Sequence, residues 1–171
     1  MLKTFATICI IGMFTSSCTS KKASRTEGSH EAEQDLTMIV GTYTSGDSKG
    51  LYSFRFNEEN GTATALSEAE VENPSYLVPS ADGKFIYAVS EFSNEQAAAN
   101  AFAFNKEEGT FRLLNTQKTG GEDPCYIITN GSNVVTANYS GGSISVFPID
   151  KDGSLLPASE VVKFKGSGAD K

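Results

Sequence analysis

The chain has 171 residues, of which 39% are hydrophobic and 20% charged, a globular balance that excludes collagen-like and wholly disordered chains. Its 21 acidic residues against 14 basic ones give a formal net charge of −7, the wrong sign for binding nucleic acid. The one histidine, His30, lies in a polar stretch near the N-terminus. Ser-His-Asp triads, Cys-His dyads and histidine-rich zinc sites are therefore excluded, because each needs a histidine in the folded body.

Residues 1–17 have the layout of a secretory signal peptide. A single basic residue, Lys3, precedes an apolar run from Phe5 to Phe14, and small residues follow before Cys18. The apolar run is well short of the about 20 residues that a transmembrane helix needs. The small-small-Cys ending resembles the processing site of bacterial lipoproteins, which implies that Cys18 becomes the lipidated first residue of the mature chain. An ordinary cleaved secretory leader is the alternative.

Residues 18–35 are rich in Ser, Lys, Thr, Glu and Gly, which predicts a flexible tether after the lipidated cysteine. We expect a protein that is exported and lipid-anchored at the cell envelope, with a soluble periplasmic or secreted protein as the alternative. Because an anionic membrane surface repels an acidic domain, membrane contact is expected only through the lipid anchor.

Cys125 is the one cysteine of the body, and we expect a buried thiol rather than a disulfide.

From about residue 36 onwards the chain repeats a set of short segments. The motif Pro-Ser-Tyr-Leu at 74–77 returns as Pro-Cys-Tyr-Ile at 124–127, and a polar glycine turn follows each copy. The apolar run at 85–91 is matched at 134–139 and, in an earlier copy, at 38–43. Self-similarity at a fixed period is the sequence signature of a repeat architecture.

Alternating strands that end in a glycine turn complete each repeat. They occur near residues 51–61, 101–109 and 144–153. Their central phenylalanines, Phe54, Phe102 and Phe147, are 48 and 45 residues apart. Repeats of about 40 to 50 residues with four strands are typical of β-propeller blades. The sequence therefore predicts an all-β fold for residues 36–171, a partial β-propeller of about three four-stranded blades, with an unrelated β-sandwich as the alternative.

The first blade is expected to be shorter than the other two. Its strands are predicted near residues 38–44, 51–57 and 63–69, with a missing fourth strand expected from outside this segment. Four aromatic residues are expected to pack between blades: Tyr76, Tyr87, Phe102 and Phe104.

A set of motifs resembles the lactonase family of β-propellers, which includes the propeller form of 6-phosphogluconolactonase. The motifs are Gly-Thr-Tyr-Thr at 41–44, Asn-Pro-Ser-Tyr-Leu at 73–77, Tyr-Ala-Val-Ser-Glu at 87–91 and Ala-Asn-Tyr-Ser-Gly-Gly at 137–142. This resemblance covers the chain from about residue 37 to its end. It implies a seven-bladed ring of which this chain is a fragment that lacks the C-terminal blades, and it implies hydrolysis of a small-molecule lactone or sugar derivative.

The geometry of a propeller blade separates the polar residues into two groups. Hairpin turns such as Asp82-Gly83 lie at one end of the blades, where turn conformation explains their composition. The other end is expected to collect polar residues from two places in each blade. Asn73 and Asp123 come before the innermost strands, and Glu91, Asn138 and Tyr139 come after the second strands.

Lactone hydrolysis needs a base that activates water and donors that stabilise the developing oxyanion. We predict that Glu91 is the catalytic base and that Asn73, Asp123, Asn138 and Tyr139 bind substrate. No cofactor is expected. No metal is expected either, because the Asp150–Ser154 segment begins like a calcium loop but has its glycine too early and no closing glutamate.

Two functions stay open at this point. The first is a lactonase, a carboxylic-ester hydrolase acting on a sugar-acid lactone, active in the full-length parent and inactive in this fragment. The alternative is a non-catalytic propeller at the cell envelope that binds a carbohydrate or a protein. Fold alone does not decide between them.

Overall fold

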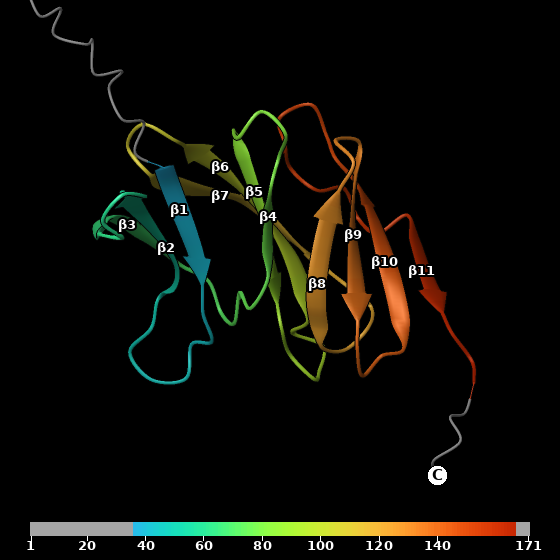
Figure 1. Cartoon of the computed structure of the whole chain (residues 1–171). Helices are drawn as coiled ribbons and strands as arrows, with labels where there is room; N and C mark the ends of the chain where they lie inside the picture. Colours follow the sequence, from blue (N-terminus) through green and yellow to red (C-terminus); the bar gives the residue numbers. More distant parts are fainter. Residues whose placement is uncertain (1–35, 167–171) are drawn as a thin grey trace, which may run out of the picture. The chain divides into compact units, whose positions relative to one another are not determined.

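The computed structural model describes residues 36–166, all of which belong to one compact unit. These residues form eleven β-strands and no helix, which confirms the predicted all-β fold (Figure 1). Within this part of the chain there is accordingly no helix long and apolar enough to cross a membrane. The predictions of a signal peptide, of lipidation at Cys18 and of a tether at 18–35 lie outside the described residues.

The strands form three antiparallel sheets in chain order. They are β1 (Leu36–Gly41), β2 (Gly50–Phe56), β3 (Ala63–Glu70), β4 (Leu77–Pro79), β5 (Phe85–Ser90), β6 (Ala98–Asn105), β7 (Thr110–Lys118), β8 (Pro124–Thr129), β9 (Asn133–Asn138), β10 (Ser143–Pro148) and β11 (Glu160–Lys163). The first sheet has three strands, β1 to β3, and the other two have four each, which confirms the prediction of a shorter first blade.

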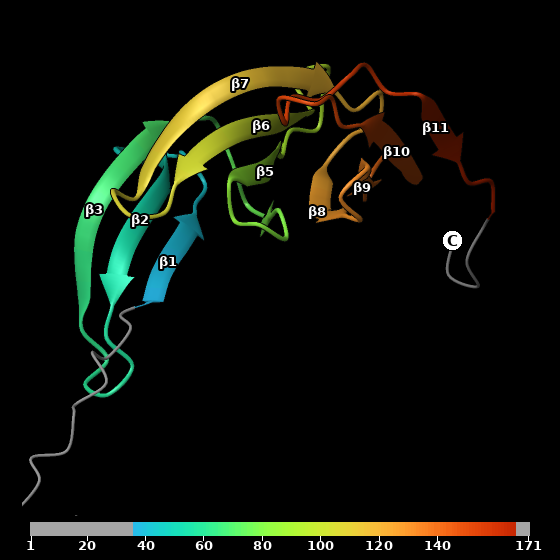
Figure 2. The same ribbon diagram turned by 90° about the horizontal axis from the view of Figure 1, so that it is seen from above.

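The three sheets follow one another along an arc. Figure 2 shows β1 and β8 on the inner side of this arc and β3, β7 and β11 on its outer side, and β4 is the edge strand opposite β7 in the middle sheet. Each sheet is a simple meander, so the chain runs from the inner to the outer edge and then enters the next sheet. This arrangement is that of a partial β-propeller, as predicted.

Burial along the strands follows from the position of each sheet. The middle sheet has neighbours on both faces, and β5 and β6 are therefore buried along almost their whole length. In the third sheet, β9 and β10 alternate between buried and half-buried residues, because only one face packs on the middle sheet. The sequence of β5 consequently reads as a nearly continuous apolar run, whereas that of β10 alternates between small polar and apolar residues.

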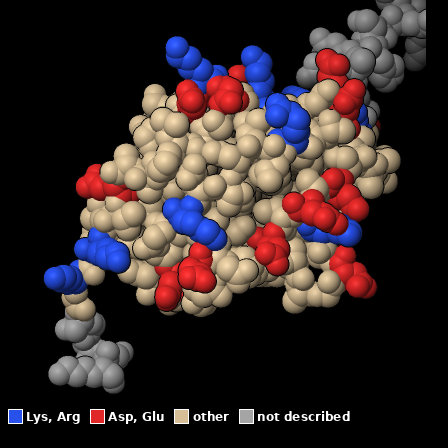
Figure 3. Space-filling model, turned by 180° about the vertical axis from the view of Figure 1, so that it is seen from behind, with Lys and Arg blue, Asp and Glu red and all other residues tan. Residues whose placement is uncertain are grey.

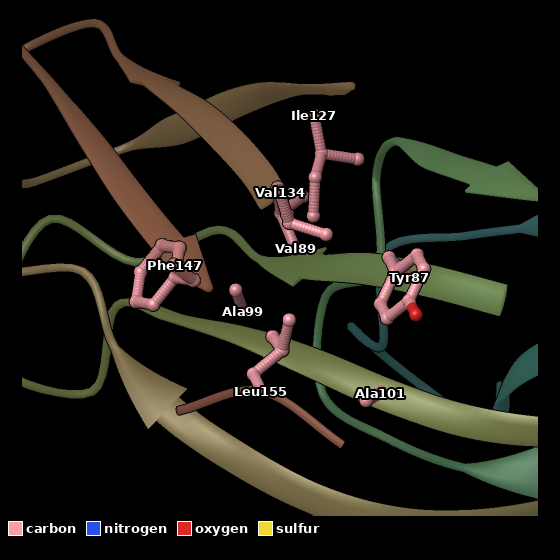
Figure 4. Packing of buried hydrophobic residues seen from close by; sticks show 8 residues of the cluster. All are labelled: Tyr87, Val89, Ala99, Ala101, Ile127, Val134, Phe147 and Leu155. Carbon is pink, nitrogen blue, oxygen red and sulfur yellow. The ribbon is translucent and has the colours of Figure 1, made fainter. Parts of the chain in front are cut away.

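Two hydrophobic clusters hold the sheets together. The cluster between the second and third sheets contains Tyr87, Val89, Ile127, Phe147 and Leu155, among others (Figure 4). The cluster between the first and second sheets contains Leu51, Ile86, Ala88, Phe102 and Phe104. Three of the four aromatic residues expected to pack between blades are therefore in these clusters. The fourth, Tyr76, is partly exposed but also contacts the next blade: its ring centroid lies 4.8 Å from that of Tyr126 on β8, with the ring planes tilted by 52°.

Two glycines allow outer turns to pack closely on a neighbouring sheet. Gly109 has φ 72°, and a Cβ atom there would lie 2.6 Å from Leu66 Cδ1. Gly153 has φ 86°, and a Cβ atom there would overlap the ring of Phe85. Glycine is therefore required at both turns by backbone conformation and by space.

Charged side chains are dispersed over the outer surface. On the face in Figure 3, acidic and basic residues are interspersed and no continuous basic area forms. Two ion pairs are present in the described part of the chain, Lys49 with Glu70 and Lys84 with Asp82, and both are exposed. Exposed pairs of this kind contribute little to stability.

Candidate functional site

The polar residues singled out from the sequence meet at one end of the sheets. The amide of Glu91, directly after β5, donates to the carbonyl oxygen of Asn73 over 3.0 Å. In the next sheet the amide of Tyr139, directly after β9, donates to the carbonyl oxygen of Asp123 over 2.8 Å. Glu91 and Tyr139 thus occupy equivalent positions in successive sheets, beside the start of the innermost strands.

The carboxylate of Glu91 is fixed through one of its two oxygens. Its Oε2 accepts hydrogen bonds from Tyr43 Oη, at 2.9 Å, and from Ser75 Oγ. Tyr43 follows β1 and so reaches Glu91 from the first sheet, whereas Ser75 lies just before β4 in the second. Among the described residues, Oε1 of Glu91 has no hydrogen-bond partner. This oxygen is therefore free to accept a hydrogen from a bound molecule.

Tyr43 is held in its protonated form by these surroundings. The hydrogen bond to Glu91 raises the pKa of the Tyr43 phenol above its ordinary value of 10.0, and partial burial and the negative charge of Glu91 raise it further. The phenol is thus a hydrogen-bond donor throughout the neutral pH range. The residue is 56% exposed, so Tyr43 stands at the surface of the site rather than in the interior.

Asn73 connects the first sheet to Glu91. Its Oδ1 accepts hydrogen bonds from the amide and from the hydroxyl of Thr44, both at 3.0 Å. Its Nδ2 donates to the carbonyl oxygen of Glu91 over 3.2 Å. The side chain therefore fixes the segment that carries Tyr43 to the segment that carries Glu91.

Asp123 has the corresponding place between the second and third sheets. Ser93 Oγ donates to its Oδ1 over 2.6 Å. Hydrogen bonds from the hydroxyls of Ser140 and Ser93 hold the pKa of Asp123 below its ordinary value, so the group is ionised at neutral pH. Its carboxylate lies at the same end of the sheets as Glu91.

Asn138 is placed differently from the expectation. The residue is 2% exposed, its Oδ1 accepts from Thr136 Oγ1 at 3.0 Å, and its Nδ2 donates to Ser143 and Ser145 at 3.1 and 2.9 Å. Both amide hydrogens are therefore used inside the third sheet. Asn138 has no donor left for a substrate, and its role is to hold β9 against β10.

Two further residues of the third sheet lie at the surface. Tyr139 is 82% exposed, which leaves its phenol accessible to a ligand. Cys125 is also exposed, so the expectation of a buried thiol is wrong. Cys125 lies on β8, the innermost strand of its sheet, and is the unpaired residue of a bulge between Pro124 and Tyr126, which interrupts the alternation that would have placed it.

Sequence reasoning missed Tyr43 and Ser75 as partners of Glu91. Both residues stand in the motifs that were noted, but their contact with Glu91 depends on how the first and second sheets face each other. Within residues 36–166 no group of three or more His, Cys, Asp and Glu is placed to hold a metal ion.

Cavities of the described region lie both beside this site and away from it. One of about 600 Å³ adjoins Asp123 and is lined by Ser93 and Glu122, among others. Another of about 450 Å³ lies between the first and second sheets and is lined by Ile39, Leu77, Asp82, Ile86 and Phe104, among others. It adjoins the turn between β4 and β5, at the opposite end of the sheets from Glu91. The candidate site is thus an open surface of hydroxyl, phenol and carboxylate groups on the inner side of the arc.

Sequence comparison gives two independent matches to known proteins. The family model described as "Lactonase, 7-bladed beta-propeller" matches residues 37–171. The 6-phosphogluconolactonase of Bacillus subtilis is 38% identical over 128 residues, which cover 71% of this chain and 36% of that protein.

Solved structures agree with these matches. A Bacteroides fragilis protein, provisionally named a 6-phosphogluconolactonase, is 70% identical with a TM-score of 0.80, over 82% of this chain and 40% of its own. The periplasmic gluconolactonase of Pseudomonas aeruginosa is 30% identical with a TM-score of 0.69, over 74% of this chain and 38% of its own. The chain thus spans less than half the length of these relatives. It belongs to the lactonase family of seven-bladed β-propellers.

Proposed function

We propose that the full-length protein containing this chain hydrolyses the lactone of a sugar acid, and that the 171-residue chain has no turnover by itself. The names of its relatives support the reaction, since they include 6-phosphogluconolactonases and a gluconolactonase. The observation that carries the proposal is the carboxylate of Glu91, fixed at Oε2 by two hydroxyl donors and free at Oε1. The three sheets alone supply less than half of the ring found in these relatives, which supports the inactivity of the chain.

Glu91 is assigned the role of general base. Its free Oε1 accepts a proton from a water molecule as the water oxygen attacks the lactone carbonyl carbon. The tetrahedral intermediate then collapses with cleavage of the ring C–O bond, which gives the open hydroxy acid. A carboxylate whose rotamer is fixed in advance needs little reorganisation to act as a base in this step.

The neighbouring groups are assigned to the polyol part of the substrate. The ionised Asp123 accepts hydrogen bonds from sugar hydroxyls, and the exposed phenol of Tyr139 donates and accepts them. Asn73 contributes by holding Glu91 in place through its carbonyl oxygen and its side-chain amide.

An assay of acid release tests this function. The full-length protein is mixed with glucono-δ-lactone or with 6-phosphogluconolactone, and proton release is followed with a pH indicator beside the 171-residue chain and a protein-free sample. Proton release above the spontaneous rate is expected with the full-length protein. The 171-residue chain and the protein-free sample are expected to show the spontaneous rate. Calorimetric binding of the sugar acid without any turnover of either lactone would instead support the non-catalytic binding propeller.

We also propose export and lipid anchoring at Cys18, with residues 18–35 as a tether to the domain at 36–171. The leader sequence supports this, as does the periplasmic location in the name of the Pseudomonas aeruginosa relative. Metabolic labelling with an alkyne fatty acid is expected to mark the wild-type protein and not Cys18→Ser. An exported but unlabelled wild-type protein would favour the soluble alternative, and an unprocessed cytoplasmic protein would overturn export altogether.

A further inference from the structure

We propose that Tyr43 and Glu91 form an acid–base pair in which Tyr43 protonates the leaving ring oxygen of the lactone. This inference rests on the proposed function and gives a catalytic role to a residue of the first sheet. The pair joins two sheets, since Tyr43 Oη donates to Glu91 Oε2 over 2.9 Å. Its two members therefore face one reaction centre from adjacent blades.

The segment that carries Tyr43 is fixed on both sides of the phenol. The amide and the hydroxyl of Thr42 each donate to the carbonyl oxygen of Gly50 over 3.0 Å. The amide and the hydroxyl of Thr44 donate to Asn73 Oδ1, also over 3.0 Å. The backbone around Tyr43 is thus held by four hydrogen bonds, while its ring remains more than half exposed. A fixed backbone that carries an accessible hydroxyl is the geometry that proton donation to a bound ligand requires.

Holding Glu91 does not by itself explain the phenol. Ser75 Oγ already donates to the same Oε2, and Asn73 holds the backbone of Glu91 on both its amide and its carbonyl group. Glu91 thus has partners other than the phenol at its carboxylate, its amide and its carbonyl oxygen. The phenol therefore adds a second titratable group beside the base, which a purely structural contact would not need.

The proton balance of the reaction closes with these two groups. Water loses a proton to Glu91 Oε1 and its oxygen bonds to the carbonyl carbon. The ring C–O bond breaks, and the departing oxygen takes the proton of Tyr43 Oη. The proton on Glu91 then returns to the phenolate through solvent, which both groups reach. Lactone and water give the hydroxy acid, and the pair returns to its starting state.

The phenol of Tyr43 becomes more acidic during the reaction, as proton donation requires. The bond to Glu91 and its negative charge raise the pKa of Tyr43, so the proton is retained in the resting site. Once Glu91 has taken a proton, this charge is gone and the phenol becomes a stronger acid. Even with a raised pKa, a phenol is more acidic than the aliphatic sugar hydroxyl that leaves, because an aliphatic hydroxyl resembles water in its very weak acidity.

A leaving-group comparison separates this role from a structural one. The full-length Tyr43→Phe protein is assayed with an oxygen lactone and with the thiolactone of the same acid, both of which the wild-type protein is expected to hydrolyse. A thiolate leaves without prior protonation, because a thiol has a pKa of about 8.5. The kcat for the oxygen lactone is expected to fall about 100-fold, and that for the thiolactone to stay within about threefold.

Tyr126→Phe is the matched control, since it removes a phenol oxygen from the inner surface and keeps the ring on Tyr76. Both rates should remain at the wild-type level in this variant. Equal losses on both substrates in Tyr43→Phe, an unchanged oxygen-lactone rate, or a wild-type protein that hydrolyses only the oxygen lactone would each overturn the proposal.

A second measurement does not depend on turnover. The ultraviolet titration of wild-type protein minus that of Tyr43→Phe isolates the Tyr43 phenol. Its pKa is expected above 10.0 and should fall in the Glu91→Gln background, because the hydrogen bond to the carboxylate and its negative charge, which both raise this pKa, are removed. A pKa that Glu91→Gln leaves unchanged would refute the pair. Absence of any lactone turnover together with the expected titration would instead refute the proposed function and leave the contact intact.

Discussion

Asn73 and Asp123 adopt the same left-handed backbone conformation at the same point of two successive sheets. Their φ angles are 48° and 53°, and each residue directly precedes a proline. The carbonyl oxygen of Asn73 accepts the amide of Glu91, and that of Asp123 accepts the amide of Tyr139. A conformation that is costly for residues other than glycine is therefore used twice to place side chains at the end of the innermost strands.

Substitution of Asn73 should separate this strain from the side-chain contacts. Asn73→Ala loses the bonds to Thr44 and Glu91 and keeps an unfavourable φ, so we expect the free energy of unfolding to fall by about 3 kcal/mol. Asn73→Gly loses the same bonds without the strain and should cost about 1 kcal/mol less. Urea unfolding of both variants measures the difference. Equal losses would show that the backbone conformation contributes nothing.

Gly109 and Gly61 form a matched pair for testing the packing of the first two sheets. Their φ angles are 72° and 71°, but an added Cβ at Gly109 would lie 2.7 Å from Ser53 Oγ, whereas nothing lies within 4 Å at Gly61. Gly61→Ala should cost about 1 kcal/mol of unfolding free energy through strain alone. Gly109→Ala should cost about 2 kcal/mol more, because the sheets must separate. Similar unfolding midpoints would argue against the close contact.

Asn138→Ala should affect stability rather than substrate binding. Removing the buried amide leaves Thr136, Ser143 and Ser145 with unmatched groups, so we expect a loss of about 2 to 3 kcal/mol in unfolding free energy. The folded fraction should keep its KM for the lactone. A raised KM with unchanged thermal stability would restore Asn138 to the substrate-binding group.

Tyr87 should make the domain sensitive to alkali. Burial, with smaller effects of Asp82 and Asp152, raises the pKa of this phenol from 10.0 to about 12. The pKa of Tyr87 is higher in the folded than in the unfolded protein. The stability that the protonated phenol contributes is therefore complete below pH 10 and is lost as the pH rises towards 12. A shift from 10.0 to about 12 sets an upper limit of about 2.7 kcal/mol on the loss in unfolding free energy. Tyr87→Phe should flatten this part of the stability profile, and an equally steep profile would contradict the assignment.

The fold could be predicted largely because repeated motifs encode local structure. The alternation near residues 51–57 and the turn at Asp82-Gly83 specify strands and hairpins without reference to the rest of the chain. The placement of Asn138 was also encoded, since Val134, Thr136 and Asn138 are two residues apart and share the buried face of β9. That alternation was a usable signal for burial.

The contacts of Glu91 were less accessible from the sequence. Which hydroxyls reach its carboxylate depends on the packing of one sheet against the next, and Tyr43 lies 48 residues away in the chain. The exposure of Cys125 likewise depends on a local bulge that no sequence motif predicted. Side-chain partners between blades are set by tertiary packing, which periodicity does not describe.

The most direct test of the account is the turnover of Glu91→Gln in the full-length protein, compared with Asp123→Asn. Removing the base should lower kcat for a sugar lactone by about 10² to 10⁴-fold with little change in KM. Asp123→Asn should raise KM and keep kcat within about threefold, because this carboxylate is assigned to binding. A Glu91→Gln protein that hydrolyses the lactone at the wild-type rate would contradict the central claim.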